Sequence, residues 1–78
     1  PVLYPNPVEG ILYLRLTGFS PVKQVDIELV DGMGRSMMNL QGNGDTEMQI
    51  DVTHFSNGIY FIRMAQDSKI QNARFVKK

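Results

Sequence analysis

The chain contains no cysteine, no tryptophan and only one histidine. Without cysteine it can form no disulfide, no thiolate metal site and no cysteine nucleophile. Many small extracytoplasmic domains are held together by disulfides, so this one must rely on side-chain packing alone. No apolar run approaches the ~20 residues that span a bilayer. Neither a signal peptide nor an initiator Met opens the chain, and we therefore expect a domain excised from a longer protein.

Groups that could carry out catalysis are equally scarce. His54 is the only histidine, and no serine stands in a G-x-S-x-G motif. Asn43–Glu47 places oxygen ligands at alternate positions, as the start of a calcium loop does, but Met48 occupies the position of the loop glycine and His54 that of its last glutamate. A polar hairpin loop explains this stretch better. The sequence therefore predicts no catalytic, cofactor-binding or metal-binding residue, and a protein that is not an enzyme.

The 78 residues predict one domain, residues 1–78. A domain of this size buries only about 60 to 65% of the surface of its unfolded chain, which leaves no room for a deep substrate cavity. Its net charge is zero, so nothing attracts the whole domain to nucleic acid. The charges are nevertheless uneven, because residues 63–78 carry five Lys or Arg against one acid, whereas residues 1–62 carry seven acids against three Lys or Arg.

Apolar residues recur at every second position, which is the period of a half-buried strand. No segment keeps the 3.6-residue period for the roughly 10 to 12 residues that a helix needs. Seven strands are predicted, over Val2–Tyr4, Ile11–Thr17, Gln24–Asp31, Arg35–Leu40, Glu47–Val52, Gly58–Ala65 and Lys69–Lys77. Strands at spacings of about 8 to 12 residues with turn chemistry between them favour an all-β fold, a sandwich of two antiparallel sheets.

Two of these segments carry more specific predictions. Gly58–Ala65 is apolar on both faces, which indicates a central strand. Asp31–Gly34 is a tight turn in which Gly34 is expected to adopt a positive φ, because glycine does so without steric cost. The neighbouring Arg35 is expected to pack or pair near the chain terminus.

Four stretches together resemble the C-terminal sorting domain of the type IX (Por) secretion system of Bacteroidetes. Leu3–Pro7 (LYPNP) is similar to the opening "YPNP" of that family. Val25–Arg35 (VDIELVDGMGR) is similar to its alternating strand that ends in D-x-x-G-R. Phe55–Arg63 (FSNGIYFIR) resembles its G-[IV]-Y-[FL]-[IV] strand, and Ala73–Lys78 (ARFVKK) resembles its basic "K-F-V-K" ending. The motifs occur in the family's order and cover essentially the whole chain.

The resemblance implies an immunoglobulin-like β-sandwich at the C-terminus of a larger secreted cargo. It implies that the cargo enters the periplasm by a Sec signal, that the domain engages the outer-membrane translocon, and that a sortase-like peptidase usually removes it. The cargo is then released, or anchored at the cell surface on anionic lipopolysaccharide. Within the motifs, the resemblance assigns structural positions to Pro5, Asn6, Pro7, Asp31, Gly34, Arg35, Gly58 and Tyr60.

An export signal needs no active site, but it needs an exposed feature that a receptor can bind. We expect the last strand to supply this feature, with Phe75 anchored in the sandwich and with Lys77 and Lys78 presenting charge beside the terminal carboxylate. An exposed edge strand can also pair with a partner strand, or with a second copy as a strand-edge dimer. The residues predicted to contact the sorting machinery are Lys69, Arg74, Phe75, Val76, Lys77 and Lys78.

A second hypothesis is an accessory binding module of a secreted enzyme, one that takes up carbohydrate or protein. Such a module needs an exposed row of aromatic side chains or a calcium site. Tyr13 and Tyr60 are the aromatic candidates for a sugar platform, although packing in the core or at a sheet edge explains both more simply.

Overall fold

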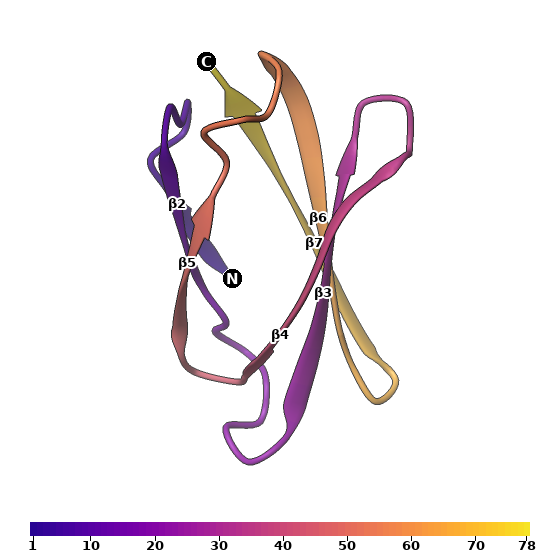
Figure 1. Ribbon diagram of the computed structural model, residues 1–78. Helices are drawn as coiled ribbons and strands as arrows, with labels where there is room; N and C mark the ends of the chain where they lie inside the picture. The colour runs from indigo at the N-terminus through magenta and orange to yellow at the C-terminus, as the bar shows by residue number, and fades with distance from the viewer.

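The computed structural model covers residues 1–78 and contains seven strands and no helix (Figure 1). No helix long and apolar enough to cross a membrane is found. All seven predicted strands are confirmed. Their bounds are β1 Val2–Tyr4, β2 Ile11–Arg15, β3 Gln24–Asp31, β4 Ser36–Asn43, β5 Glu47–Asp51, β6 Gly58–Gln66 and β7 Lys69–Lys77.

The largest boundary difference is in β4. The predicted strand ended at Leu40, but Gly42 and Asn43 continue it and pair with Val25 and Gln24 of β3. The chain turns only afterwards, at Gly44 and Asp45, because β3 is long enough to offer partners to the end of β4.

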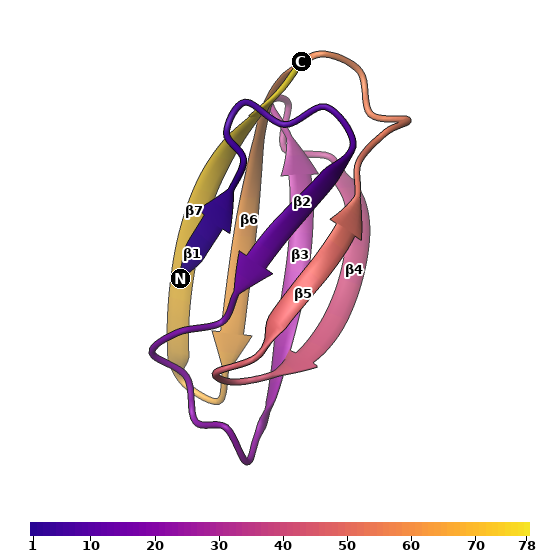
Figure 2. The ribbon, with the colours of Figure 1, turned by 90° about the vertical axis from the view of Figure 1, so that its left-hand side faces the viewer.

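The strands form two antiparallel sheets that pack face to face. One sheet has the order β1-β2-β5 and the other the order β4-β3-β6-β7. Figure 2 shows the three-stranded sheet lying across the four-stranded one. This is the pairing of an immunoglobulin-like sandwich, in which strands A, B and E face strands C′, C, F and G. The predicted fold class is confirmed.

The core lies between the sheets and contains 14 buried apolar residues. Burial alternates along the strands as the two-residue period requires, so Leu12 and Leu14 of β2 face Ile27 and Leu29 of β3 across the sandwich interior. Each fully buried side chain of this kind contributes about 1.5 to 3 kcal/mol to the free energy of unfolding. Packing of alternate residues therefore replaces the absent disulfides.

β6 is a central strand, as predicted, because β3 and β7 pair with it on either side. Its inward residues Tyr60, Ile62 and Met64 are buried in the core. Its outward residues Ile59 and Phe61, however, remain 47% and 42% exposed. The apolar character of the second face of β6 thus marks an uncovered surface.

The two ends of the sandwich differ in what they contain (Figure 1). The C-terminus, the β3–β4 hairpin and the start of β6 lie together at one end, which we call the motif end. The β2–β3 connection and the β6–β7 hairpin lie together at the opposite end, which we call the network end.

Candidate functional site

Residues from three of the four sequence motifs stand in one row across the four-stranded sheet at the motif end. Asp31 of β3 is the register partner of Tyr60 of β6, and Tyr60 is in turn the partner of Phe75 of β7. Tyr60 and Phe75 belong to the core, and Asp31 is buried beside them with its carboxylate bound to the β3–β4 turn. Motifs separated by up to 44 positions in the sequence are therefore adjacent across hydrogen-bonded strands.

Tyr60 organises the start of β6. Its hydroxyl donates a 2.6 Å hydrogen bond to the backbone oxygen of Ser56, four residues upstream. This is the tyrosine corner of immunoglobulin-like sandwiches, which fixes the connection that crosses from one sheet to the other. The Tyr60 ring also stacks on Phe75, with centroids 5.4 Å apart, and contacts Phe55 at 5.0 Å. Tyr60 of the G-x-Y motif thus holds the start of β6 through this hydrogen bond and its ring contacts.

Asp31 closes the β3–β4 turn with its carboxylate. Oδ1 accepts 2.9 Å hydrogen bonds from the backbone N–H groups of Met33 and Arg35, and Oδ2 accepts one at 2.8 Å from Nε of Arg35. The backbone N–H of Arg35, followed by its guanidinium and the N–H of Met33, holds the pKa of Asp31 below its usual value, although desolvation opposes the shift. Gly34 has φ +83°, which confirms the predicted positive φ.

Arg35 does not pack or pair near the chain terminus, so that prediction is wrong. Its guanidinium pairs with Asp31 four residues before it, and its side chain is 78% exposed. The reason is local: the tight turn brings the two residues together, and a nearby carboxylate partner is available without crossing to β7.

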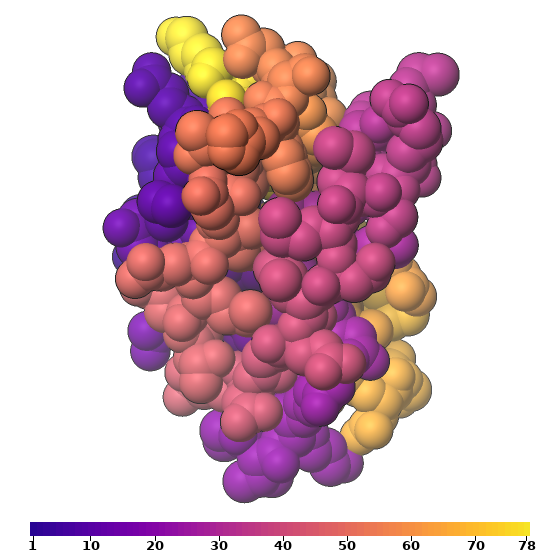
Figure 3. All heavy atoms as spheres, viewed as in Figure 1, coloured from indigo at the N-terminus to yellow at the C-terminus, as the bar shows by residue number.

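The first motif holds the last strand in place. The N–H of Val76 donates to Oδ1 of Asn6 at 2.9 Å, and Nδ2 of Asn6 donates to the backbone oxygen of Arg74 at 3.4 Å. The buried Val8 then exchanges 2.9 Å backbone bonds with Val76 and Lys78. We call these four hydrogen bonds the terminal bridge. In Figure 3 the last residues lie against the N-terminal segment at this end of the molecule.

The terminal bridge occupies the outer edge of β7 from residue 74 to residue 78. Asn6 sits between Pro5 and Pro7, and both X–Pro peptide bonds of the motif are cis. Further along β7, the backbone groups of Ile70 and Asn72 that point away from β6 have no partner in a turn, loop or neighbouring strand. This part of the β7 edge is open to another strand.

The C-terminal candidates divide into buried and exposed residues. Phe75 is fully buried, which confirms that it anchors the last strand. The prediction that Lys77 presents charge is wrong, because Lys77 is only 7% exposed and its Nζ donates to the backbone oxygen of Lys78. In a strand, residue 77 shares the inward face with residue 75. Arg74, Val76 and Lys78 are exposed, as is Lys69 at the other end of β7.

Lys69 is not brought near the other candidates. It begins β7 at the network end, ~26 Å along the strand from Lys77. There its Nζ donates to the backbone oxygen of Gly18 and lies 5.8 Å from the centroid of the Phe19 ring. The predicted contact set is therefore two separate sites, one at each end of β7.

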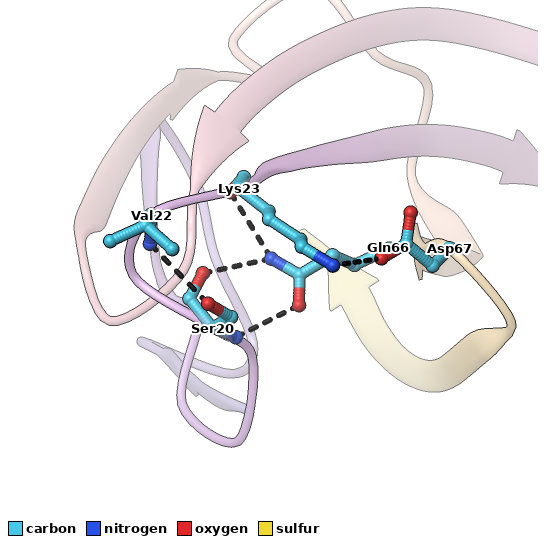
Figure 4. A network of polar contacts seen from close by, with 5 residues as sticks. All are labelled: Ser20, Val22, Lys23, Gln66 and Asp67. Atoms are coloured by element: carbon cyan, nitrogen blue, oxygen red, sulfur yellow. Dashed lines mark hydrogen bonds and ion pairs between the residues drawn. The ribbon is translucent and has the colours of Figure 1, made fainter.

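The network end is closed by a buried glutamine that sequence reasoning did not single out (Figure 4). Gln66 accepts a 2.8 Å hydrogen bond from the N–H of Ser20 and donates to the backbone oxygens of Ser20 and Lys23. Lys23 in turn pairs with Asp67 at 2.7 Å, and this hydrogen bond raises the pKa of Lys23. The signal for Gln66 was present in the sequence, since it follows Tyr60, Ile62 and Met64 on the inward face.

The aromatic candidates for a sugar platform are not together. Tyr60 lies in the core, whereas Tyr13 is half-buried on the outer face of the three-stranded sheet and stacks on Tyr4, with centroids 5.3 Å apart. His54 is exposed at the β5–β6 corner, and no cluster of three or more His, Cys, Asp or Glu side chains is suited to a metal ion. The binding-module hypothesis stays a prediction.

A family model described as the secretion system C-terminal sorting domain matches residues 2–78. The chain belongs to this family. As a sorting domain it takes part in type IX secretion, where it interacts with the secretion machinery and accompanies an N-terminal cargo through the outer membrane to the cell surface or the medium. Sorting domains of this family are generally non-catalytic. A comparison with curated proteins gives no match.

Proposed function

We propose that this domain is a non-catalytic sorting signal that the type IX translocon binds at the motif end. The cargo crosses the inner membrane by a Sec signal, and the domain folds in the periplasm before it reaches the translocon. A sortase-like peptidase then removes the domain, and the cargo is released or anchored at the cell surface.

The observation that carries the proposal is the meeting of the family motifs at one end of the sandwich. Asp31, Tyr60 and Phe75 stand in one row, and Asn6 binds the strand that contains Phe75. The inward-facing residues of these motifs stabilise the motif end through their contacts with one another. A surface maintained by so many long-range contacts is pre-organised, which lowers the entropy lost when a partner binds.

The exposed residues at this end supply the contacts. The side chains of Arg74, Val76 and Lys78 are exposed, while the backbone groups beside them are held by the terminal bridge. The partner therefore contacts side chains there, and strand addition is expected at the open edge around Ile70 and Asn72. A strand-edge dimer through these two residues also stays a prediction.

The experiment attaches residues 1–78 to a fluorescent reporter that carries a Sec signal, in a host with an active type IX system. We expect the reporter at the cell surface or in the medium, and the same reporter without the domain in the periplasm. Removing Phe75–Lys78 is expected to strand the reporter in the periplasm. Since that deletion also removes a core side chain, a second fusion carries Lys78→Ala, which removes the exposed charge and keeps Phe75 and the backbone bonds of the terminal bridge.

The second fusion is expected to melt near the wild-type temperature and to be exported less. Lys69→Ala is the control at the other end of β7 and is expected to be exported normally. Equal export of reporters with and without residues 1–78 would contradict the proposal. The size of the exported reporter tests peptidase removal separately, because cleavage shortens it by about the 8.8 kDa of the domain.

A further inference from the structure

The outer face of β6 and β7 carries apolar and cationic side chains without a covering element. Ile59 pairs in register with Val76, and Phe61 pairs with Arg74. Ile59, Phe61 and Val76 are 47%, 42% and 36% exposed. Arg63, two residues after Phe61, is exposed on the same face, diagonal to Arg74. We call these five residues the β6–β7 patch.

The cations of the patch are unpaired. The two salt bridges of the domain are Lys23–Asp67 and Arg35–Asp31, and neither involves Arg63 or Arg74. No acid lies on either strand within the patch. The closest acids on this face are on β3, where Glu28 is the register partner of Arg63 but forms no ion pair with it. Two guanidinium groups thus lie beside exposed apolar side chains and form no ion pair within the domain.

The outer face of the other sheet provides a contrast. Ile11 and Arg15 occupy similar outward positions on its central strand β2, and Ile11 is 37% exposed. Arg15, however, is the register partner of Glu47, and Asp51 lies opposite Ile11. On that sheet an acid stands opposite both Arg15 and Ile11, whereas in the patch only Arg63 has an acidic register partner, Glu28, and Arg74 has none.

We infer that the β6–β7 patch is a docking surface for an acidic, partly apolar protein segment of the secretion machinery, an inference that rests on the proposed function. Carboxylates of the partner pair with Arg63 and Arg74, and its aliphatic side chains cover Ile59, Phe61 and Val76. Arginine suits this role because its planar guanidinium binds a carboxylate through two parallel hydrogen bonds while its face packs on apolar groups. The docking surface therefore includes β6 as well as the last strand.

Complementary charge argues for a different protein as the occupant. Two copies that met through the patch alone would bring four unpaired arginines together, and like charges across an interface weaken association. An acidic partner turns the same charges into attraction and also accelerates encounter.

The test uses the reporter fusion with substitutions that leave the core intact. Arg63→Glu combined with Arg74→Glu is expected to lower the exported fraction about tenfold or more, since repulsion replaces attraction. The double lysine variant, Arg63→Lys with Arg74→Lys, keeps the charge and is expected to retain most of the export. Ile59→Thr combined with Phe61→Thr is expected to reduce export while the strand keeps residues that favour β-structure.

Matched controls are Arg15→Glu and Ile11→Thr on the other sheet, and both are expected to be exported normally. Melting temperatures of all purified domains show whether a loss of export comes from unfolding. If the wild-type fusion is exported and the folded patch variants are exported equally well, the inference is wrong while the proposed function stands. If the wild-type fusion is not exported, the proposed function itself fails.

Sedimentation of the purified domain tests whether a second copy of this chain occupies the β6–β7 patch. A monomer at micromolar concentration agrees with docking to a different protein. A dimer that the Ile59→Thr and Phe61→Thr changes dissociate would overturn the inference, because the patch would then be an interface between copies of this chain.

Discussion

The two ends of the sandwich use similar residues in opposite ways. At the network end the cations are engaged, since Lys23 binds Asp67 and Lys69 binds the backbone oxygen of Gly18. At the motif end Arg35 binds Asp31, but Arg74 forms no ion pair and Lys78 is exposed. The buried polar group of the network end, Gln66, is satisfied by backbone groups of one loop. The polar groups of the network end thus bind one another, whereas the motif end is rigid but keeps unpaired charges that a partner can bind.

The largest effect is expected from the core residue of the motif end. Phe75→Ala removes a fully buried ring that stacks on Tyr60, and it is expected to lower the free energy of unfolding by about 3 to 5 kcal/mol. Lys69→Ala on the same strand is expected to cost less than about 1 kcal/mol. Urea denaturation followed by circular dichroism measures both. If Phe75→Ala does not fold, Phe75→Leu is the variant to measure, and its free energy of unfolding is expected to be lower than that of the wild type. Equal free energies of unfolding for the wild type and all variants would contradict the comparison.

A smaller effect is expected at the network end, and it separates stability from sorting. Gln66→Ala leaves the N–H of Ser20 and the carbonyls of Ser20 and Lys23 without a side-chain partner, at a cost of about 2 kcal/mol. Export of the reporter fusion is nevertheless expected to be normal below the melting temperature of the variant. Loss of export by a folded Gln66→Ala domain would show that the network end also contacts the machinery.

The smallest effect is expected in the β3–β4 turn. Gly34→Val is expected to lower the free energy of unfolding by more than about 1 kcal/mol through backbone strain, because φ is +83° there. A Cβ at Gly34 meets no atom within 4 Å, so crowding contributes little. In the matched pair Gly34→Ala and Gly32→Ala, thermal melting should show the greater loss at residue 34. An unaltered melting temperature in both Gly34 variants would argue against strain.

The strands could be predicted from the sequence because the features that produce them are local. Alternation in β2, β3 and β6 follows from the pleat of a strand, and the turn glycines mark where the strands end. The same alternation could have placed Lys77 inward, since Phe75 was already assigned to the core. The motif at Leu3–Pro7 was recognised, but its structural task could not be derived from the sequence.

The missed contacts are those between distant segments. Val8 shows no periodic pattern, and its partners lie almost 70 positions later in the chain. Ser56 contributes only a backbone oxygen, which every residue type has. Likewise, the apolar outer face of β6 indicated a covered central strand, whereas the structure shows that only one of its faces is covered. Sequence periodicity reports that a face is apolar, and it does not report what covers it.

The terminal bridge also bears on the order in which the domain folds. It joins residues 6–8 to residues 74–78 and so closes almost the whole chain into a loop, which has a larger entropic cost than any hairpin in the sandwich. Contacts of such long range are slow to form, because the entropy of closing the loop is lost before the contacts stabilise the fold. The backbone beside Arg74 and Lys78 therefore gains its last hydrogen bonds only when residues 6–8 dock on β7, and we expect a partner that binds these side chains to favour cargo whose tail has completed folding.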